Sequence, residues 1–234
     1  MNRVALIVGV GPGLGAALGR RFARGGFCVA LVARTPEFIG ELARELSSLG
    51  QTALAIVAEA SSPTEMARAV ARARTELGPI GVLVHNASSS SGDGLLRTTA
   101  TQFEQTWRIA ALGAFVCARE IAPDMIAAGN GAMILTGATS SVRGGGWLAF
   151  SSAKFALRGL AQSLARELWP QGIHVAHVVV DGLIGPRGFA QTESLEPMLD
   201  PDRMADAYFQ LTEQDRSAWT LELDLRPHRE RFFE

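Results

Sequence analysis

Four glycines alternate with other residues near the beginning of the chain, in the segment Gly9-Val10-Gly11-Pro12-Gly13-Leu14-Gly15. The apolar run Val4–Val8 precedes this segment, and small and apolar residues at helical spacing follow it. Nucleotide phosphates bind to backbone N–H groups at a helix N-terminus, where side chains would obstruct their approach. A glycine-rich turn between a strand and a helix meets that need, so the segment predicts a dinucleotide-binding site. A tight turn kept small for packing is the alternative.

A basic residue follows the next apolar run. Arg34 comes directly after Val32-Ala33, about 20 residues beyond the glycine-rich turn, where the adenosine ribose of a dinucleotide is expected. An acidic residue there would accept hydrogen bonds from the ribose hydroxyls and select NAD, whereas a guanidinium suits a 2′-phosphate. Arg34 therefore favours NADP(H) over NAD(H), with a solvated arginine at the start of a helix as the alternative.

Short runs rich in Val, Ile and Leu recur along the chain and predict the strands that position these residues. The runs are Val4–Val8, Phe27–Val32, Thr52–Val57, Ile80–His85, Ala132–Thr136, Ile173–Val180 and Trp219–Leu225. Segments of helical length separate them, which indicates βαβ crossovers and a parallel sheet covered by helices on both faces. We predict an α/β Rossmann fold, with a doubly wound parallel sheet of about seven strands flanked by helices.

The length of 234 residues indicates a single domain spanning residues 1–234. The stretch at 185–203 interrupts the alternation, because Pro186, Pro197 and Pro201 stand among residues of mixed polarity. We predict that this stretch is a mobile lid over the site.

The composition is that of a globular protein, with 47% hydrophobic residues, 19% charged residues and 25 Gly. A net charge of −1 without a basic block argues against a nucleic-acid partner. No uncharged apolar stretch approaches about 18 residues, which argues against a membrane partner. The apolar run after Met1 is too short for a signal peptide. Cys28 and Cys117 lack CxxC spacing and predict buried thiols in a reducing compartment, so we expect a cytoplasmic protein.

With these features, the chain resembles the short-chain dehydrogenase/reductase (SDR) superfamily over nearly its whole length. The T-G-x-x-x-G-x-G motif of that family corresponds to Val8–Gly15, with Val8 in place of Thr. The acid after the third strand corresponds to Glu59, the N-N-A-G motif to His85-Asn86-Ala87-Ser88, the Y-x-x-x-K motif to Phe150-Ser151-Ser152-Ala153-Lys154, and the P-G turn to Asp181-Gly182. The resemblance implies a nicotinamide dinucleotide bound by Gly9, Gly11, Gly13, Leu14, Gly15, Arg34, Glu59, Asn86, Ala87, Lys154, Gly182 and Ile184.

The chain departs from the family at the catalytic residues. In the family, a Tyr transfers the proton, a Lys four residues later binds the nicotinamide ribose, a Ser holds the substrate oxygen and an Asn supports a water relay. Lys154 is present, but Phe150 occupies the Tyr position. The Ser position falls on Gly137 or on Ala138, depending on the alignment, and the Asn position falls on Ala110. Three of the four roles therefore lack their usual residue.

Other residues are candidates for the unfilled roles. Ser140 and Ser141 lie close enough in the chain to replace the missing Ser, and His85 ends the fourth predicted strand near the cofactor. His177 lies within an apolar strand, which predicts a core histidine whose hydrogen bonds are satisfied. Tyr208 is the single tyrosine of the chain, and no pattern in the sequence brings it to the nicotinamide.

Three functions are compatible with this pattern. The first is an NADP(H)-dependent oxidoreductase that acts on a small carbonyl or alcohol substrate with a degenerate catalytic set. The second is a catalytically inactive dinucleotide-binding scaffold or sensor, in which Lys154 only contacts ribose hydroxyls. The third is a changed reaction, such as reduction of an activated C=C bond. We favour the first, and the resemblance also implies a homodimer or homotetramer built on the helices that carry Phe115 and Phe155.

Overall fold

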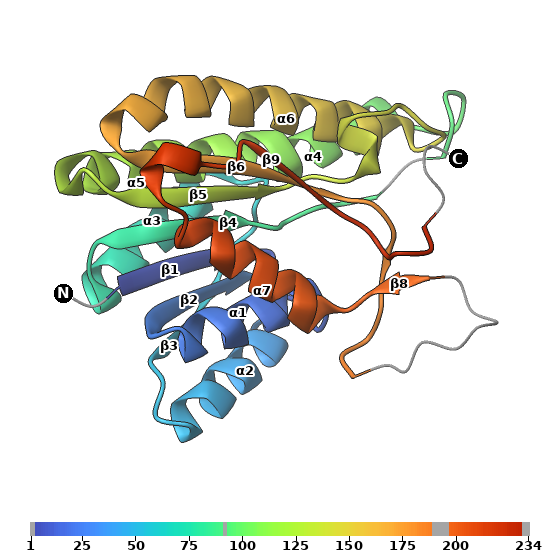
Figure 1. Cartoon of the computed structure of the whole chain (residues 1–234). Helices are drawn as coiled ribbons and strands as arrows, with labels where there is room; N and C mark the ends of the chain where they lie inside the picture. The colour runs from blue at the N-terminus through green and yellow to red at the C-terminus, as the bar shows by residue number, and fades with distance from the viewer. Residues whose placement is uncertain (1–2, 91–92, 189–196, 231–234) are drawn as a thin grey trace.

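The computed structural model describes residues 3–90, 93–188 and 197–230 of the chain. Seven parallel strands form one sheet in the order β3-β2-β1-β4-β5-β6-β9 (Figure 1). They are β1 (Arg3–Val8), β2 (Phe27–Ala33), β3 (Ala53–Val57), β4 (Ile80–His85), β5 (Gly131–Thr136), β6 (Ile173–Val180) and β9 (Glu222–Leu225). Every predicted strand is present, so the predicted doubly wound sheet is confirmed. The last strand begins at Glu222 rather than at the predicted Trp219, so residues 219–221 lie outside β9.

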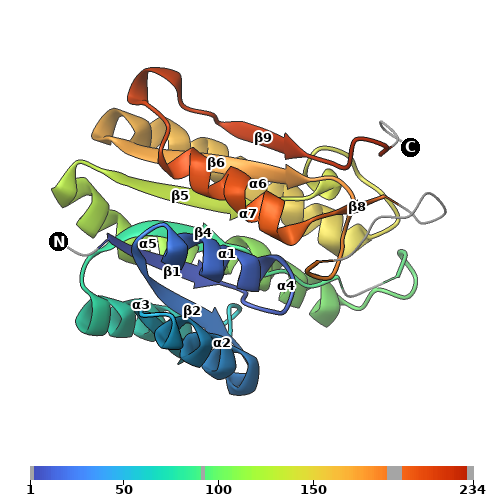
Figure 2. The ribbon, with the colours of Figure 1, turned by 60° about the horizontal axis from the view of Figure 1, so that its bottom comes forward.

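Helices cover both faces of the sheet, as Figures 1 and 2 show. One face packs against α1 (Leu14–Arg24), α2 (Pro36–Ser48) and α7 (Pro201–Thr212). The other face packs against α3 (Pro63–Leu77), α5 (Gly113–Ala128) and α6 (Leu148–Leu168). The remaining helix, α4 (Ala100–Trp107), packs against α6 and continues into α5 through a π-helical turn, Arg108–Leu112. Three short 3₁₀ turns complete the described helical structure, at Thr139–Ser141, Trp169–Gln171 and Arg216–Ala218.

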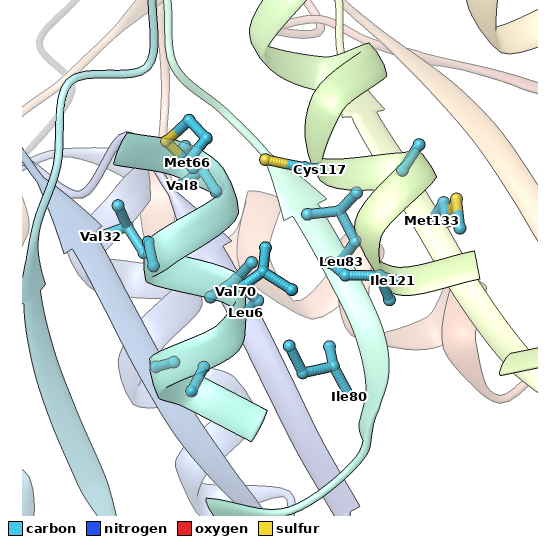
Figure 3. Packing of buried hydrophobic residues seen from close by; sticks show 14 of the residues in the cluster. Leu6, Val8, Val32, Met66, Val70, Ile80, Leu83, Cys117, Ile121 and Met133 are labelled. Carbon is cyan, nitrogen blue, oxygen red and sulfur yellow. The ribbon is translucent and has the colours of Figure 1, made fainter. Parts of the chain in front are cut away.

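The core lies in two layers because successive side chains of a strand point to opposite faces. In β1, Leu6 and Val8 pack on the α3 and α5 side, whereas Ile7 packs on the α1 and α2 side. Figure 3 shows the first of these layers, where Cys117 lies beside Leu83. Burial raises the pKa of the Cys117 thiol to about 12. Cys28 and Cys117 are both buried and free, which confirms the predicted thiols.

The order of the strands creates the place for a ligand. β1 lies between β2 and β4, so the chain leaves the centre of the sheet in one direction and later continues in the other. In open α/β sheets, ligands bind outside the carboxyl ends of the strands at this switch point. The glycine-rich turn follows β1 and therefore lies at this point.

A two-stranded ribbon outside the main sheet was not predicted. β7 (Leu183–Ile184) pairs in parallel with β8 (Met198–Leu199), beyond the carboxyl ends of the main strands (Figure 1). Residues 189–196 of the predicted lid at 185–203 lie outside the described residues, and the lid stays a prediction. Its last residues, from Pro201 onward, belong to α7.

No helix within the described ranges is long and apolar enough to cross a bilayer. Phe115 and Phe155 are 42% and 44% exposed, and the oligomer that they suggested stays a prediction.

Candidate active site

The glycine-rich turn brings bare backbone to the switch point. Gly9 has φ of +89°, and a Cβ added to it would lie 2.4 Å from the backbone nitrogen of Ala87. A Cβ on Gly15 would lie 2.6 Å from the carbonyl oxygen of Gly9. Gly11, in contrast, has open space around its missing side chain, with no atom within 4 Å of an added Cβ. Two of the glycines are therefore required by packing, and Gly11 leaves the way clear to the backbone.

The first turn of α1 is available for an anion. Gly13 stands at the N-cap position, where it cannot cap with a side chain, and the first turn carries no acidic residue. The N–H groups of a helix N-terminus attract negative charge, and an uncapped first turn leaves donors for it. The structure thus presents a cradle of the kind that phosphates bind.

A cleft of about 570 Å³ extends from the glycine-rich turn along the ends of β2 and β3. Arg34 and Glu59 both line this cleft and form an ion pair, with 3.9 Å between Arg34 Nε and Glu59 Oε2. The Arg34 side chain is 70% exposed, so this ion pair is weak and leaves the guanidinium available to another anion.

A second cleft, of about 870 Å³, continues from the first toward β5, β6 and α6. The two clefts share Gly9, Gly11, Asn86 and Ser88, and therefore form one groove. Asn86 connects the segment after β4 to the glycine-rich turn, because the Asn86 Nδ2 donates a hydrogen bond to the Gly9 carbonyl oxygen at 3.0 Å. The groove can accept an elongated ligand with its phosphates at the glycine-rich turn.

Lys154 lies in the second cleft and is only 2% exposed. Its Nζ donates a hydrogen bond to the Thr136 carbonyl oxygen at 2.7 Å. Burial lowers the pKa of the Lys154 ammonium to about 8. Phe150, one helical turn earlier on α6, also lines the cleft, and the centre of its ring lies 5.4 Å from Nζ. Positions i and i+4 share a helix face, which is why both side chains reach the same cleft.

The residues at the predicted Ser position cannot supply a hydroxyl. Gly137 and Ala138 both line the cleft. A Cβ at Gly137 would lie 2.2 Å from Nε2 of His177, so this space is already occupied by the imidazole. Ser141 is buried, and its Oγ accepts a hydrogen bond from the Ala138 backbone nitrogen at 3.0 Å. Ser140 does line the cleft and stays a candidate for the missing donor.

The residue at the predicted Asn position also carries no polar group. Ala110 is buried within the π-helical turn between α4 and α5, with a methyl group in place of an amide. Such turns are frequent at functional sites, but here the turn presents no polar side chain at this position.

His85, His177 and the single tyrosine do not line the second cleft. His85 is fully buried, and burial, with a smaller contribution from the Lys154 charge, lowers its pKa to about 3. Burial likewise lowers the pKa of His177 to about 4, although its Nδ1 lies 3.1 Å from Oε2 of Glu222. Tyr208 is fully buried and donates to Thr136 Oγ1 at 3.0 Å, and burial raises its pKa. Both histidines are therefore neutral at neutral pH, which makes His85 a poor proton donor.

His177 agrees only in part with its prediction as a core histidine. The imidazole is 1% exposed, but Nε2 has no hydrogen-bond partner among the described residues.

Several residues at the mouth of the second cleft were missed by the sequence analysis. The Thr139 hydroxyl donates to the Asp181 carboxylate, and Arg226 Nη1 lies 2.8 Å from Asp181 Oδ2. Glu230 and Trp147 also line the cleft, and Trp147 is 57% exposed. Arg226 and Glu230 follow the last strand in a segment without any motif, so no local signal could have found them.

All twelve residues predicted to bind the dinucleotide line the groove. Arg34, Glu59 and Ala87 line the first cleft; Gly9, Gly11 and Asn86 line both; Gly13, Leu14, Gly15, Lys154, Gly182 and Ile184 line the second.

Comparison with known proteins gives concordant matches. A family model described as short chain dehydrogenase matches residues 3–189. A short-chain dehydrogenase/reductase of Armillaria gallica is 33% identical over 179 residues, which cover 74% of this chain and 68% of that protein. The crystal structure of a short-chain dehydrogenase from Rhodopseudomonas palustris is 36% identical, with a TM-score of 0.86 over 97% of this chain and 100% of that one. A short-chain dehydrogenase from Sphingobium yanoikuyae in complex with NADPH is 27% identical, with a TM-score of 0.82 over 95% of this chain and 87% of that one.

Proposed function

The chain belongs to the short-chain dehydrogenase/reductase family, and on this premise we propose that it is an NADP(H)-dependent oxidoreductase acting on a small carbonyl or alcohol. The observation that carries the proposal is the continuous groove. It has an uncapped glycine-rich turn at its centre, Arg34 at one end and buried Lys154 at the other.

The first cleft would hold the adenosine half of the cofactor. The backbone at Gly11 and the first turn of α1 would bind the pyrophosphate, because no side chain obstructs them. Arg34 would bind the 2′-phosphate with its exposed guanidinium, in competition with Glu59. The adenosine would lie against Ala87 and the stem of Glu59.

The second cleft would hold the nicotinamide half. The bound cofactor would exchange a hydride with the substrate carbon. Lys154 would donate hydrogen bonds to the nicotinamide ribose, and the backbone at Gly182 and Ile184 would face the carboxamide. Phe150 and Trp147 would exclude water from the substrate and pack against its apolar part.

The proposal includes a degenerate catalytic set. Phe150 has no proton to transfer, Gly137 or Ala138 stands at the Ser position, and Ala110 stands at the Asn position. Loss of general acid catalysis costs about 10²- to 10⁴-fold in rate, which leaves room for a slow reaction or for another donor.

The cofactor preference can be tested by titrating the protein with NADPH and NADH and following nicotinamide fluorescence. Hydrogen bonds to a charged group contribute about 1.5–3 kcal/mol, and the 70% exposure of Arg34 and the nearby Glu59 reduce this toward about 1–2 kcal/mol. Arg34→Ala should therefore weaken NADPH binding about 5- to 30-fold and leave NADH binding unchanged. Arg119→Ala, an exposed arginine on α5, is the matched control.

Each outcome of this titration is informative. Equal loss for both cofactors in Arg34→Ala would remove the case for NADP(H), while leaving a nicotinamide dinucleotide site. Binding of neither cofactor by the wild-type protein would refute the oxidoreductase proposal. Tight NADPH binding without turnover on any carbonyl would favour the inactive scaffold instead.

A further inference from the structure

Few groups in the second cleft are able to give a proton to a substrate. Among the described residues that line it, the titratable ones are Lys154, Asp181 and Glu230. Carboxyl groups ordinarily carry no proton at neutral pH, and Asp181 is already bound by Thr139 and Arg226. The hydroxyls of Ser90 and Ser140 are too weakly acidic to donate without an activating partner.

Lys154 is also singular in the composition of the chain. The sequence contains 22 Lys and Arg residues, and Lys154 is the only lysine among them. Arginine stays protonated in proteins, whereas a lysine ammonium readily changes its protonation when buried. Among the 22 Lys and Arg residues, the one whose side chain can release a proton near neutral pH is thus the one placed in this cleft.

The hydrogen bonding of Lys154 leaves protons to give. An ammonium has three N–H donors, and the Thr136 carbonyl oxygen accepts one of them. No carboxylate in the described part of the chain forms an ion pair with Nζ. The apolar ring of Phe150 lies over the ammonium, so the side of Nζ beside that ring offers no competing acceptor.

The surroundings of Lys154 also favour proton release. Burial lowers its pKa to about 8, close to the pH at which a general acid is most effective. The other titratable groups around it are His85 on β4, His177 on β6, and Asp181 and Glu230 at the mouth of the cleft. Both histidines have lowered pKa values and are neutral when Lys154 titrates.

We propose that Lys154 is itself the proton donor of the reaction and delivers a proton from Nζ to the substrate oxygen. This inference rests on the proposed function. In carbonyl reduction, the carbonyl carbon gains a hydride from NADPH, the electron pair of the C=O double bond moves to oxygen, and that oxygen takes the proton from Nζ. The carbonyl is reduced and the nicotinamide oxidised. Lys154 remains as a neutral amine and regains a proton from solvent after the alcohol leaves.

The first test follows Lys154 without any substrate. Because the chain has one lysine, ¹⁵N-lysine labelling gives a single side-chain signal, which can be titrated by NMR. We expect the signal to titrate near pH 8 in the free protein. Titration near the ordinary lysine value of about 10.5 would overturn the inference.

The second test changes only the acidity of this amine. Cell-free synthesis with thialysine in place of lysine alters position 154 alone and supplies an amine of lower intrinsic pKa. NADPH oxidation by 9,10-phenanthrenequinone is then measured against pH. We expect the rate to fall above the pKa of the amine, and the falling limb to move to lower pH in the thialysine protein. A limb that stays in place would overturn the inference, because a purely structural lysine would not move it.

The third test separates proton transfer from cofactor binding. Lys154→Arg keeps the charge and the hydrogen-bond donors but cannot release a proton in this pH range. It should retain NADPH binding, measured by nicotinamide fluorescence, and lose about 10²- to 10⁴-fold in turnover. Ser152→Ala, an exposed position on the same helix, is the control. A thermal unfolding curve matching the wild type shows that the variant is folded.

The outcomes distinguish this inference from the function on which it rests. If folded Lys154→Arg turned over at the wild-type rate, Lys154 would be refuted as the donor. NADPH binding by the wild-type protein without any turnover would refute it as well. Both results would leave the cofactor site intact. Failure of the wild type to bind NADPH would refute the proposed function itself.

Discussion

Replacing Phe150 with tyrosine would place a phenol beside Lys154. Phe150 lines the second cleft, and the centre of its ring lies 5.4 Å from Nζ of Lys154. The chain has a single tyrosine, Tyr208, which is fully buried beneath the cleft. The ionisation of an introduced phenol can therefore be followed by ultraviolet absorbance almost without background, because burial raises the pKa of Tyr208.

The expected shift follows from the distance between the two groups. A phenolate and an ammonium about 5 Å apart attract each other by about 3 kcal/mol at an effective dielectric constant of 20, which equals about two pKa units. Partial burial of the phenol opposes this effect, so we expect its pKa to fall by about one to two units from 10. The two groups titrate as a coupled pair, and the apparent values belong to the pair.

The rate of carbonyl reduction should rise as well. A positioned general acid contributes about 10²- to 10⁴-fold, and Phe150→Tyr should reach about 10- to 100-fold because no hydroxyl at position 137 holds the substrate oxygen. Phe155→Tyr is the matched control, since Phe155 is 44% exposed on the same helix and its phenol should titrate near 10. If the two variants titrate alike and neither gains activity, the placement of Phe150 beside a charged Lys154 is refuted.

Three further predictions concern the backbone and the buried histidines. Gly9→Ala should abolish NADPH binding and lower the melting temperature, because φ of +89° and an atom 2.4 Å from the new Cβ cost at least about 1–3 kcal/mol; binding at the wild-type level in a fluorescence titration would contradict this. Gly137→Ser should destabilise the protein rather than restore activity, because His177 Nε2 occupies the space, and the double change with His177→Ala should recover part of the lost melting temperature. The pKa of His85 is lowered to about 3, so below pH 6.5 the unfolded chain takes up a proton that the folded chain does not, and the unfolding free energy should fall by up to about 1.4 kcal/mol per pH unit. His85→Leu, measured by urea unfolding between pH 7 and pH 5, should reduce this slope, and an unchanged slope would show that His85 is not its source.

The sheet could be predicted closely because its strands are short, buried and rich in β-branched residues. β4 and β6 have the predicted bounds, since each is short and rich in Val, Ile and Leu. The ribbon of β7 and β8 could not be predicted, because two residues per strand carry no periodicity.

The part of the groove around the glycine-rich turn was predictable for a related reason. Its chemistry depends on backbone in a local turn, and Gly9 to Gly15 encode that turn in consecutive residues. Arg34 and Glu59 follow at the ends of the next two strands, where the order of a parallel sheet places them.

The second cleft could not be predicted to the same extent, because its contacts join distant parts of the chain. The imidazole of His177 fills the space beside Gly137, and Arg226 binds Asp181 from the last segment. Neither pairing leaves a local pattern. The burial that lowers the pKa of Lys154 is likewise a property of the folded molecule.

The positions of the lining residues along the chain also determine when each cleft can form during synthesis. Every residue that lines the first cleft, except Ile109, precedes residue 89, so that cleft needs little more than β1 to β4. The second cleft must wait for Lys154, Asp181 and Glu230, which at 5–20 residues per second emerge on the order of ten seconds later. A growing chain therefore contains nearly all residues of the first cleft well before it contains Lys154, Asp181 and Glu230. The two clefts that form one groove in the folded protein therefore become possible at different times during synthesis.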